Sequence, residues 1–243
     1  MARPATGIMS KYTLEVFEDA KALAREAAGR WLAAIEKHDG SRPFTIALSG
    51  GRIPKVLYDE FVSLRPQSVG NVHFFWGDER CVPPDDEESN FKLAADNLFS
   101  PLSLPEMQIH RILGERDDAF AVAQAEAEIC RVAELSPDGQ PVLDLIFLGM
   151  GEDGHVASLF PEDEEAVAST AVYRAVIGPK PPPRRVTLGY PALALAREVW
   201  VLAAGAGKQE ALRVSLSGEE STPLARVLQL RTHTRIFTDF DLP

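Results

Sequence analysis

The chain has 243 residues, of which 45% are hydrophobic and 25% charged, and its formal net charge is −11. This composition is typical of a globular protein with a large core, and the length fits one large or two small α/β domains. The negative charge argues against general nucleic-acid binding and against attachment to anionic membranes. Cys81 and Cys130 fit neither a disulfide framework nor a metal or redox motif. No apolar stretch resembles a signal peptide or a membrane span, so we expect a soluble cytoplasmic protein.

Strands and helices are expected to alternate along nearly the whole chain. Hydrophobic patterning predicts strands at residues 12–16, 44–48, 72–76, 108–112, 143–148, 172–177, 184–188, 199–203 and 235–238. It predicts helices at residues 19–37, 54–61, 89–98, 117–135, 191–197 and 223–228, with a further helix opened by residues 205–208. Residues 162–165 are expected to form a surface turn, and the proline-rich segment 179–183 a stiff connector. This alternation predicts a mainly parallel sheet flanked by helices. Because no linker divides the chain, we expect one domain over residues 12–243 after a loose tail of residues 1–11.

The most distinctive stretch combines a buried strand with a glycine-rich loop. Residues 143–148 are apolar except for Asp144, which is typical of a strand buried on both faces. Glycines then break the strand, and the turn that they form carries Glu152, Asp153 and His155. Ligands of open α/β sheets bind beyond the carboxyl ends of the strands, so this titratable cluster is a candidate active site. A solvated turn is one alternative. A metal site is another, although adjacent residues on a turn rarely all face one ion and no second histidine cluster follows.

A glycine turn and a lysine elsewhere in the chain suggest an anionic ligand. Ser49, Gly50 and Gly51 join a strand to a helix, where backbone N–H groups and the helix dipole favour a phosphate. The turn has neither the ending of a Walker loop nor the third glycine of a dinucleotide fingerprint, and alone it is a weak signal. Lys208 stands near the start of a helix, where a cation is unfavourable unless an anion is bound nearby. An ordinary exposed lysine explains this position equally well.

Further charges gather at two other strand ends. Asp78, Glu79 and Arg80 follow an aromatic strand, and a solvated turn with a surface ion pair explains them equally well. Arg184 and Arg185 enter a strand, in which alternation directs only one of them toward a given face. Taken together, the loops predict a small phosphorylated substrate and acid–base or hydrolytic chemistry at one edge of the sheet.

These motifs together resemble one enzyme family. The resemblance rests on SGG at 49–51, GDERCVPP at 77–84, ESN at 88–90, GMGEDGHVASLFP at 149–161, RVTL at 185–188 and GAGK at 205–208. They are similar to the motifs of 6-phosphogluconolactonases, which are relatives of glucosamine-6-phosphate deaminase. The resemblance extends from about residue 12 to residue 238. It implies a modified Rossmann-like fold and a cytosolic enzyme that hydrolyses 6-phospho-D-glucono-1,5-lactone in the pentose phosphate pathway, without a cofactor.

The resemblance also implies roles for individual residues. His155 would be the general base that activates water, with Asp153 in the same pocket. Asp78 lies where the deaminases keep the carboxylate that moves a proton between sugar carbons. The residues implied to surround the substrate and its phosphate are Ser49, Gly50, Gly51, Arg80, Arg185 and Lys208. Arg52 is a further candidate, but its direction is left open because Ile53 replaces the Thr that many members carry.

Two other functions are weighed against lactone hydrolysis. An aldose–ketose isomerase or deaminase acting on an amino-sugar phosphate would carry Glu at the position of Phe160, which cannot transfer a proton. A sugar-phosphate sensor without turnover would not need His155 and Asp153. A lactone is already activated, so a water molecule and a neutral imidazole suffice, with N–H groups or an arginine stabilising the charged oxygen. We therefore expect a lactone hydrolase without a metal, acting on a small sugar phosphate as a monomer or small homo-oligomer, with no nucleic-acid or membrane partner.

Overall fold

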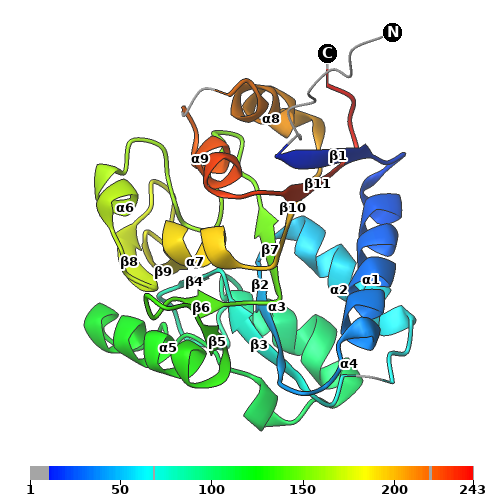
Figure 1. The fold of residues 1–243 in the computed structure, drawn as a ribbon, viewed down its shortest axis with the longest axis vertical. Helices are drawn as coiled ribbons and strands as arrows, with labels where there is room; N and C mark the ends of the chain where they lie inside the picture. Colours follow the sequence, from blue (N-terminus) through cyan, green and yellow to red (C-terminus); the bar gives the residue numbers. More distant parts are fainter. Residues whose placement is uncertain (1–10, 68, 219–220, 243) are drawn as a thin grey trace, which may run out of the picture.

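A six-stranded parallel sheet organises the chain (Figure 1). The computed structural model describes residues 11–67, 69–218 and 221–242, so the expected tail lies outside the described residues except for Lys11. The strand order is β1-β11-β10-β7-β2-β3, and all neighbouring strands are parallel. The strands are β1 (Tyr12–Val16), β2 (Phe44–Leu48), β3 (Val72–Trp76), β7 (Leu145–Gly149), β10 (Glu198–Ala203) and β11 (Thr234–Thr238). The predicted α/β fold class is confirmed.

Helices cover both faces of this sheet, as the alternation predicts. α1 (Ala20–Lys37) and α2 (Arg52–Ser63) lie on one side of β2 and β7 in Figure 1, and α7 (Tyr190–Leu195) and α9 (Pro223–Leu230) lie on the other. Trp31 of α1 stacks on Phe61 of α2 with ring centroids 3.8 Å apart and meets Phe147 of β7 edge-on at 5.1 Å. These rings are fully buried, so they fix both helices against the sheet. The other helices are α3 (Asn90–Ala94), α4 (Ser100–Leu102), α5 (Asp118–Val132), α6 (Glu164–Ala168) and α8 (Gln209–Leu216).

A second, antiparallel sheet was not predicted. Its strand order is β4 (Asp78–Arg80), β9 (Arg184–Leu188) and β8 (Tyr173–Ile177). The chain leaves the main sheet at Gly77, whose N–H still donates to Leu48 O and whose carbonyl accepts from Leu188 N–H, both at 2.8 Å. The charged segment Asp78–Arg80, for which a solvated turn was one of two interpretations, is therefore a strand. It pairs with residues that lie about a hundred positions later, which local patterning does not reveal.

Several local predictions are wrong in detail. The strand expected at residues 108–112 is a 3₁₀ turn at Glu106–Gln108 followed by one isolated bridge. The helix expected to reach residue 135 ends at Val132, because β5 (Glu134–Leu135) pairs with β6 (Pro141–Val142). The surface turn expected at 162–165 runs into α6, which the side chain of Asp163 caps. The helix expected over 89–98 is α3 followed by a π-helical turn at Ala95–Phe99.

Asp144 joins the amino ends of β7 and β2. Its Oδ2 accepts the N–H of Thr45 at 2.9 Å, and the guanidinium of Arg42 donates to both carboxylate oxygens at 2.7 and 2.5 Å. Burial acts to raise the pKa of Asp144, but the hydrogen bonds from Arg42 and Thr45 hold it below its ordinary value. This buried acid is therefore a structural clamp at the edge of the sheet opposite the carboxyl ends of the strands.

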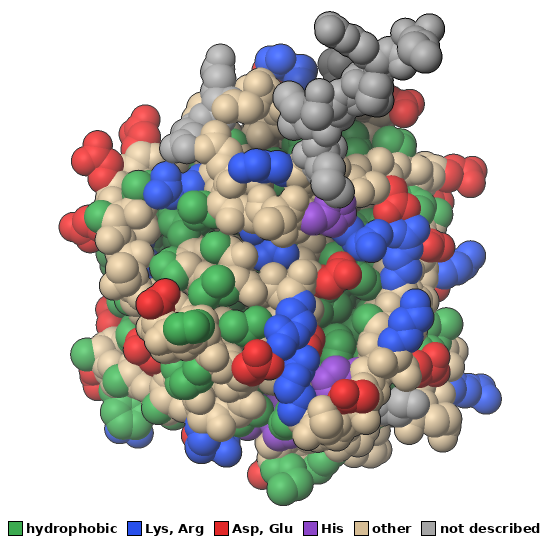
Figure 2. All heavy atoms as spheres, viewed as in Figure 1, with side chains coloured by type: hydrophobic (Ala, Val, Ile, Leu, Met, Phe, Trp, Pro, Cys, Tyr) green, Lys and Arg blue, Asp and Glu red, His purple; other side chains and the backbone are tan. Residues whose placement is uncertain are grey.

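The molecular surface is mixed in charge. On the face shown in Figure 2, acidic and basic side chains are interspersed among apolar and neutral groups. Among the described residues, no helix combines the length and the apolar character that crossing a membrane requires.

Candidate active site

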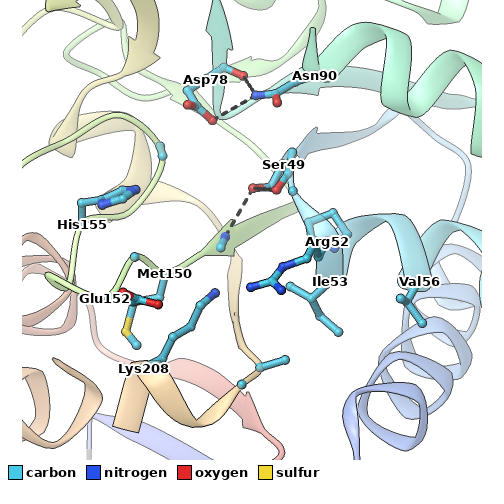
Figure 3. A pocket seen from close by; sticks show the side chains of 18 of the residues that line it. Ser49, Arg52, Ile53, Val56, Asp78, Asn90, Met150, Glu152, His155 and Lys208 are labelled. Carbon is cyan, nitrogen blue, oxygen red and sulfur yellow. Dashed lines mark hydrogen bonds between the residues drawn. The ribbon is translucent and has the colours of Figure 1, made fainter. Parts of the chain in front are cut away.

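A cleft of about 590 Å³ lies beyond the carboxyl ends of β2, β7 and β10 (Figure 3). That volume suits a small organic ligand. The cationic residues that line it are Arg52, Arg80, Lys180, Arg185 and Lys208, and the acidic ones are Asp78, Glu152 and Asp239. Because parallel strands end at the same edge of a sheet, loops that are distant in sequence converge here.

The small-residue turn after β2 forms one wall of the cleft. Gly51 precedes the first residue of α2 with φ 100°, in the left-handed region that favours glycine, and no side chain caps this helix. A Cβ on Gly50 would lie 1.7 Å from Oδ1 of Asn90, so any larger residue at this position would displace the Asn90 amide. The N–H of Gly149 donates to Ser49 Oγ at 3.3 Å, which ties the turn to the end of β7. The uncapped first turn of α2 therefore lines the cleft, as expected of an anion-binding turn.

His155 and Asp153 form a hydrogen-bonded pair on the loop after β7. Asp153 Oδ1 lies 2.5 Å from His155 Nδ1 and also accepts the N–H of His155 at 3.2 Å. Burial acts to raise the pKa of Asp153, but the imidazole of His155 and this N–H outweigh burial and hold the pKa below its ordinary value. The carboxylate is therefore held ionised. An ionised carboxylate at Nδ1 selects the Nδ1–H tautomer and leaves Nε2 as an acceptor. His155 lines the cleft, whereas Asp153, which contacts its Nδ1, does not.

Asp78 is a buried carboxylate on the opposite wall. It is 5% exposed, and Ser158 Oγ donates to its Oδ2 at 2.6 Å. Asn90 Nδ2 donates to the backbone oxygen of Asp78 at 2.8 Å and approaches its Oδ1 at 3.4 Å. The Asn90 amide thus touches both Asp78 and the Gly50 turn, so it links two segments of the predicted site.

Two arginines approach the cleft from the second sheet. Arg185 is 8% exposed and donates to the carbonyl oxygens of Pro182 and Lys180. Burial lowers the pKa of Arg185, and the charge of Arg80 lowers it further. Arg184 points elsewhere and pairs with Asp118 at 2.6 Å. The expectation that strand alternation directs only one of these adjacent arginines toward the site is therefore met.

Lys208 and Arg52 face each other across the cleft floor (Figure 3). Within the described part of the chain, neither forms a hydrogen bond or a close ion pair with a carboxylate. Burial lowers the pKa of Lys208, and the charge of Arg52 lowers it further. Two facing cations without a paired acid favour an anionic ligand between them. The direction of Arg52, which the sequence left open, is thus into the cleft.

Phe160 supports the site from behind. Its ring centroid lies 5.0 Å from that of His155. The guanidinium carbon of Arg185 lies over the same ring, 5.7 Å from its centroid. The ring is not among the cleft-lining residues. An apolar ring therefore occupies the position at which the isomerase alternative would need a carboxylate.

The structure adds two cleft-lining residues that had no role assigned from the sequence. Asn90 stood in a recognised motif but had no assigned contact, and Lys180 was part of the stiff connector. Lys180 lines the mouth of the cleft, and its backbone is held by Arg185. The only sequence signal for either residue was its neighbourhood: a helix predicted to begin at residue 89, just before Asn90, and prolines around Lys180. In the described segments, no group of three or more His, Cys, Asp or Glu side chains is arranged to hold a metal ion.

Comparison with known proteins identifies a single family. Residues 18–237 match the family model described as glucosamine-6-phosphate isomerases/6-phosphogluconolactonase. The chain is 36% identical over 223 residues to the 6-phosphogluconolactonase of Mycobacterium tuberculosis, covering 88% of this chain and 90% of that protein. It is 35% identical over 244 residues to the 6-phosphogluconolactonase of Rattus norvegicus, covering 96% and 90%.

Solved structures give the same result. The structure of devB protein superposes with a TM-score of 0.86 at 33% identity, covering 93% of this chain and 96% of that chain. The 6-phosphogluconolactonase from Leishmania guyanensis superposes with a TM-score of 0.80 at 30% identity, with the same coverage of both chains.

Proposed function

Because the chain belongs to the family of glucosamine-6-phosphate isomerases and 6-phosphogluconolactonases, we propose that it hydrolyses 6-phospho-D-glucono-1,5-lactone to 6-phospho-D-gluconate. This reaction is the second step of the oxidative pentose phosphate pathway. The observation that carries the proposal is the Asp153–His155 pair, which presents a free Nε2 to a cleft that also holds two facing, unpaired cations.

The phosphate of the substrate binds at the floor of the cleft. Arg52 and Lys208 supply positive charge, and the turn formed by Ser49, Gly50 and Gly51 supplies backbone N–H groups at the start of α2. A charge-assisted hydrogen bond contributes roughly 1.5–3 kcal/mol. Several such contacts anchor the phosphate, so the lactone ring is directed toward the opposite end of the cleft.

His155 acts as the general base. Nε2 of the neutral imidazole takes a proton from water as the water oxygen attacks the lactone carbonyl carbon. Asp153 holds the imidazole in the required tautomer and stabilises the imidazolium that forms. The imidazolium then returns the proton to the ring oxygen as the carbon–oxygen bond breaks. No covalent intermediate with the enzyme is required.

The remaining polar groups orient the substrate and stabilise charge. Arg80 and Arg185 lie on the wall supplied by the second sheet and neutralise the negative charge that develops on the carbonyl oxygen. Oδ2 of Asp78 accepts the hydroxyl of Ser158, and the carboxylate can accept a further hydrogen bond from a substrate hydroxyl. The isomerase alternative is not favoured, because the ring of Phe160 cannot accept or donate a proton.

We further propose that the protein works in the cytoplasm on a small sugar-phosphate lactone, as a monomer or small homo-oligomer and without nucleic acid. The acidic net charge, which disfavours binding to nucleic acid and to anionic membranes, supports this proposal. Sedimentation of the purified protein in the presence and absence of 6-phosphogluconate tests the oligomeric state, and a mass above that of a tetramer would contradict it.

A coupled assay on freshly generated lactone, corrected for spontaneous hydrolysis, tests the function. His155→Ala is expected to lower kcat by about 10²–10⁴. Binding of 6-phosphogluconate, measured by calorimetry, is expected to persist because the phosphate contacts lie on other loops. His233→Ala, which removes an imidazole near Thr13 and away from the cleft, is the matched control. Turnover of glucosamine 6-phosphate without lactone hydrolysis by the wild type would overturn the proposal.

A further inference from the structure

A buried carboxylate lies between two residues that line the cleft. Glu79 is 3% exposed, and it separates Asp78 and Arg80 on β4. Those two neighbours line the cleft, whereas Glu79 does not. Strand alternation explains this difference, since successive side chains of a strand point to opposite faces. The carboxylate of Glu79 therefore acts on the cleft only through other residues.

Four donors converge on the Glu79 carboxylate. Oε1 accepts the N–H groups of Arg80 and Asn90, both at 2.7 Å. Oε2 accepts the N–H of Phe91 at 2.7 Å and the hydroxyl of Ser89 at 3.1 Å. Two of these donors belong to the first turn of α3, where N–H groups have no partner within the helix. The carboxylate thus joins the start of α3 to β4.

The groups held by Glu79 contact the proposed substrate-binding elements. Asn90 donates to the backbone oxygen of Asp78 at 2.8 Å, and its Oδ1 occupies the space that a side chain on Gly50 would need. Arg80 donates from Nη1 to the carbonyl oxygen of Glu88, the residue before the α3 cap, at 2.7 Å. Displacing the start of α3 would therefore move the phosphate-binding turn, Asp78 and Arg80 together.

We propose that Glu79 is a positioning residue for lactone hydrolysis. It holds Asn90 and Arg80 so that the phosphate-binding turn and the oxyanion-stabilising arginine can contact one substrate molecule at the same time. This inference rests on the proposed function. Its alternative is that Glu79 only stabilises the fold, as Asp144 does at the other edge of the sheet. Both acids are buried and accept backbone N–H groups, so Asp144 provides a matched comparison.

The protonation state of Glu79 sets the conditions of the test. Burial raises its pKa to about 7, although the N–H groups of Asn90, Phe91 and Arg80 oppose that rise. At pH 8 the carboxylate is therefore mostly ionised and can accept from all four donors. Glu79→Gln keeps the shape of the side chain but replaces one accepting oxygen by an NH₂ group, so at least one backbone N–H loses its acceptor.

The experiment compares Glu79→Gln with Asp144→Asn at pH 8 and 25 °C. We expect both variants to lower Tm, but only Glu79→Gln to lower kcat at least tenfold and to weaken 6-phosphogluconate binding at least threefold. Asp144→Asn is expected to keep kcat and KM within twofold of the wild type. Equal kinetic constants in the two variants would overturn the positioning role.

A double-mutant cycle tests the route of the effect. If Glu79 acts through Asn90, Glu79→Gln should lower kcat much less in an Asn90→Ala background than in the wild type. Reductions of kcat that multiply independently in the double mutant would contradict this route. Should Glu79→Gln not fold, Ser89→Ala removes one donor to the carboxylate and Ser89→Thr keeps the hydroxyl. We then expect a two- to fivefold loss of kcat in Ser89→Ala that Ser89→Thr restores, and equal kcat in the two would overturn the proposal.

Product binding separates this inference from the proposed function. If the wild type does not hydrolyse the lactone, the proposed function fails, but weaker 6-phosphogluconate binding by Glu79→Gln than by Asp144→Asn would still support positioning of the phosphate-binding turn. If the wild type hydrolyses the lactone and both variants bind product equally, the positioning role fails alone.

Discussion

A single added methyl group at Gly151 is expected to disable the enzyme without removing any functional group. A Cβ at this position would lie 2.1 Å from Nδ1 of His155 and 2.5 Å from Oδ1 of Asp153. Non-bonded atoms of this kind need roughly 3.5 Å. The imidazole and the carboxylate must therefore move by on the order of 1 Å, which separates the pair or turns Nε2 away from the substrate.

A displacement of this size in a catalytic group lowers the rate by about 10²-fold. We expect Gly151→Ala to lower kcat by about that factor in the coupled lactone assay, with binding of 6-phosphogluconate reduced less than threefold. The φ of Gly151 is outside the left-handed region, so alanine introduces no backbone strain of its own there. Gly29→Ala, which adds a methyl group to the exposed side of α1 with no atom within 4 Å, is the control and should keep full activity. A Gly151→Ala enzyme with kcat near that of the wild type would refute the assignment of the Asp153–His155 pair.

Three further predictions concern binding, specificity and stability. Lys208→Ala should weaken substrate binding by about one to two decades while kcat changes only a few fold, and equally efficient hydrolysis of unphosphorylated gluconolactone by the wild type would contradict this phosphate contact. Phe160→Glu should not release ammonia from glucosamine 6-phosphate, because one carboxylate does not supply an amine site, and rapid release would refute this reasoning. Burial lowers the pKa of both His73 and His110, so the unfolded chain binds protons first as pH falls below about 6.5. The unfolding free energy should then decrease by up to about 1.4 kcal/mol per pH unit for each histidine. Urea unfolding measured at pH 7.5 and at pH 5.5 should show a smaller decrease between the two pH values for His73→Gln than for the wild type.

The parts of the site that follow parallel strands were predictable from the sequence. The turn at Ser49–Gly51, the His155 loop and Lys208 each follow an apolar strand that alternates with helices. Parallel strands end at a common edge, so the prediction that these loops meet needed only the strand assignments. Each of these three loops was a weak signal by itself, and the prediction of one common site came from their shared edge of the sheet.

The wall formed by the second sheet was not predictable in the same way. β4 has three residues and pairs with β9 more than a hundred positions later, so no local period marks it as a strand. The charges of Arg80 and Arg185 were visible in the sequence, but their antiparallel pairing was not. The sequence therefore indicated two cations that line the cleft, but not the strand pairing that brings them there.

Some residues without a role assigned from the sequence act through a neighbour. Glu79 and Asn90 are polar side chains beside a helix start, and this pattern is just as typical of an ordinary helix cap. Phe160 is one aromatic residue among many, and its contacts with His155 and Arg185 depend on the packing of two sheets. A group that touches the substrate must have suitable chemistry, which the sequence displays directly. A group that positions another needs only the right contacts, so it becomes recognisable when the fold brings those contacts together.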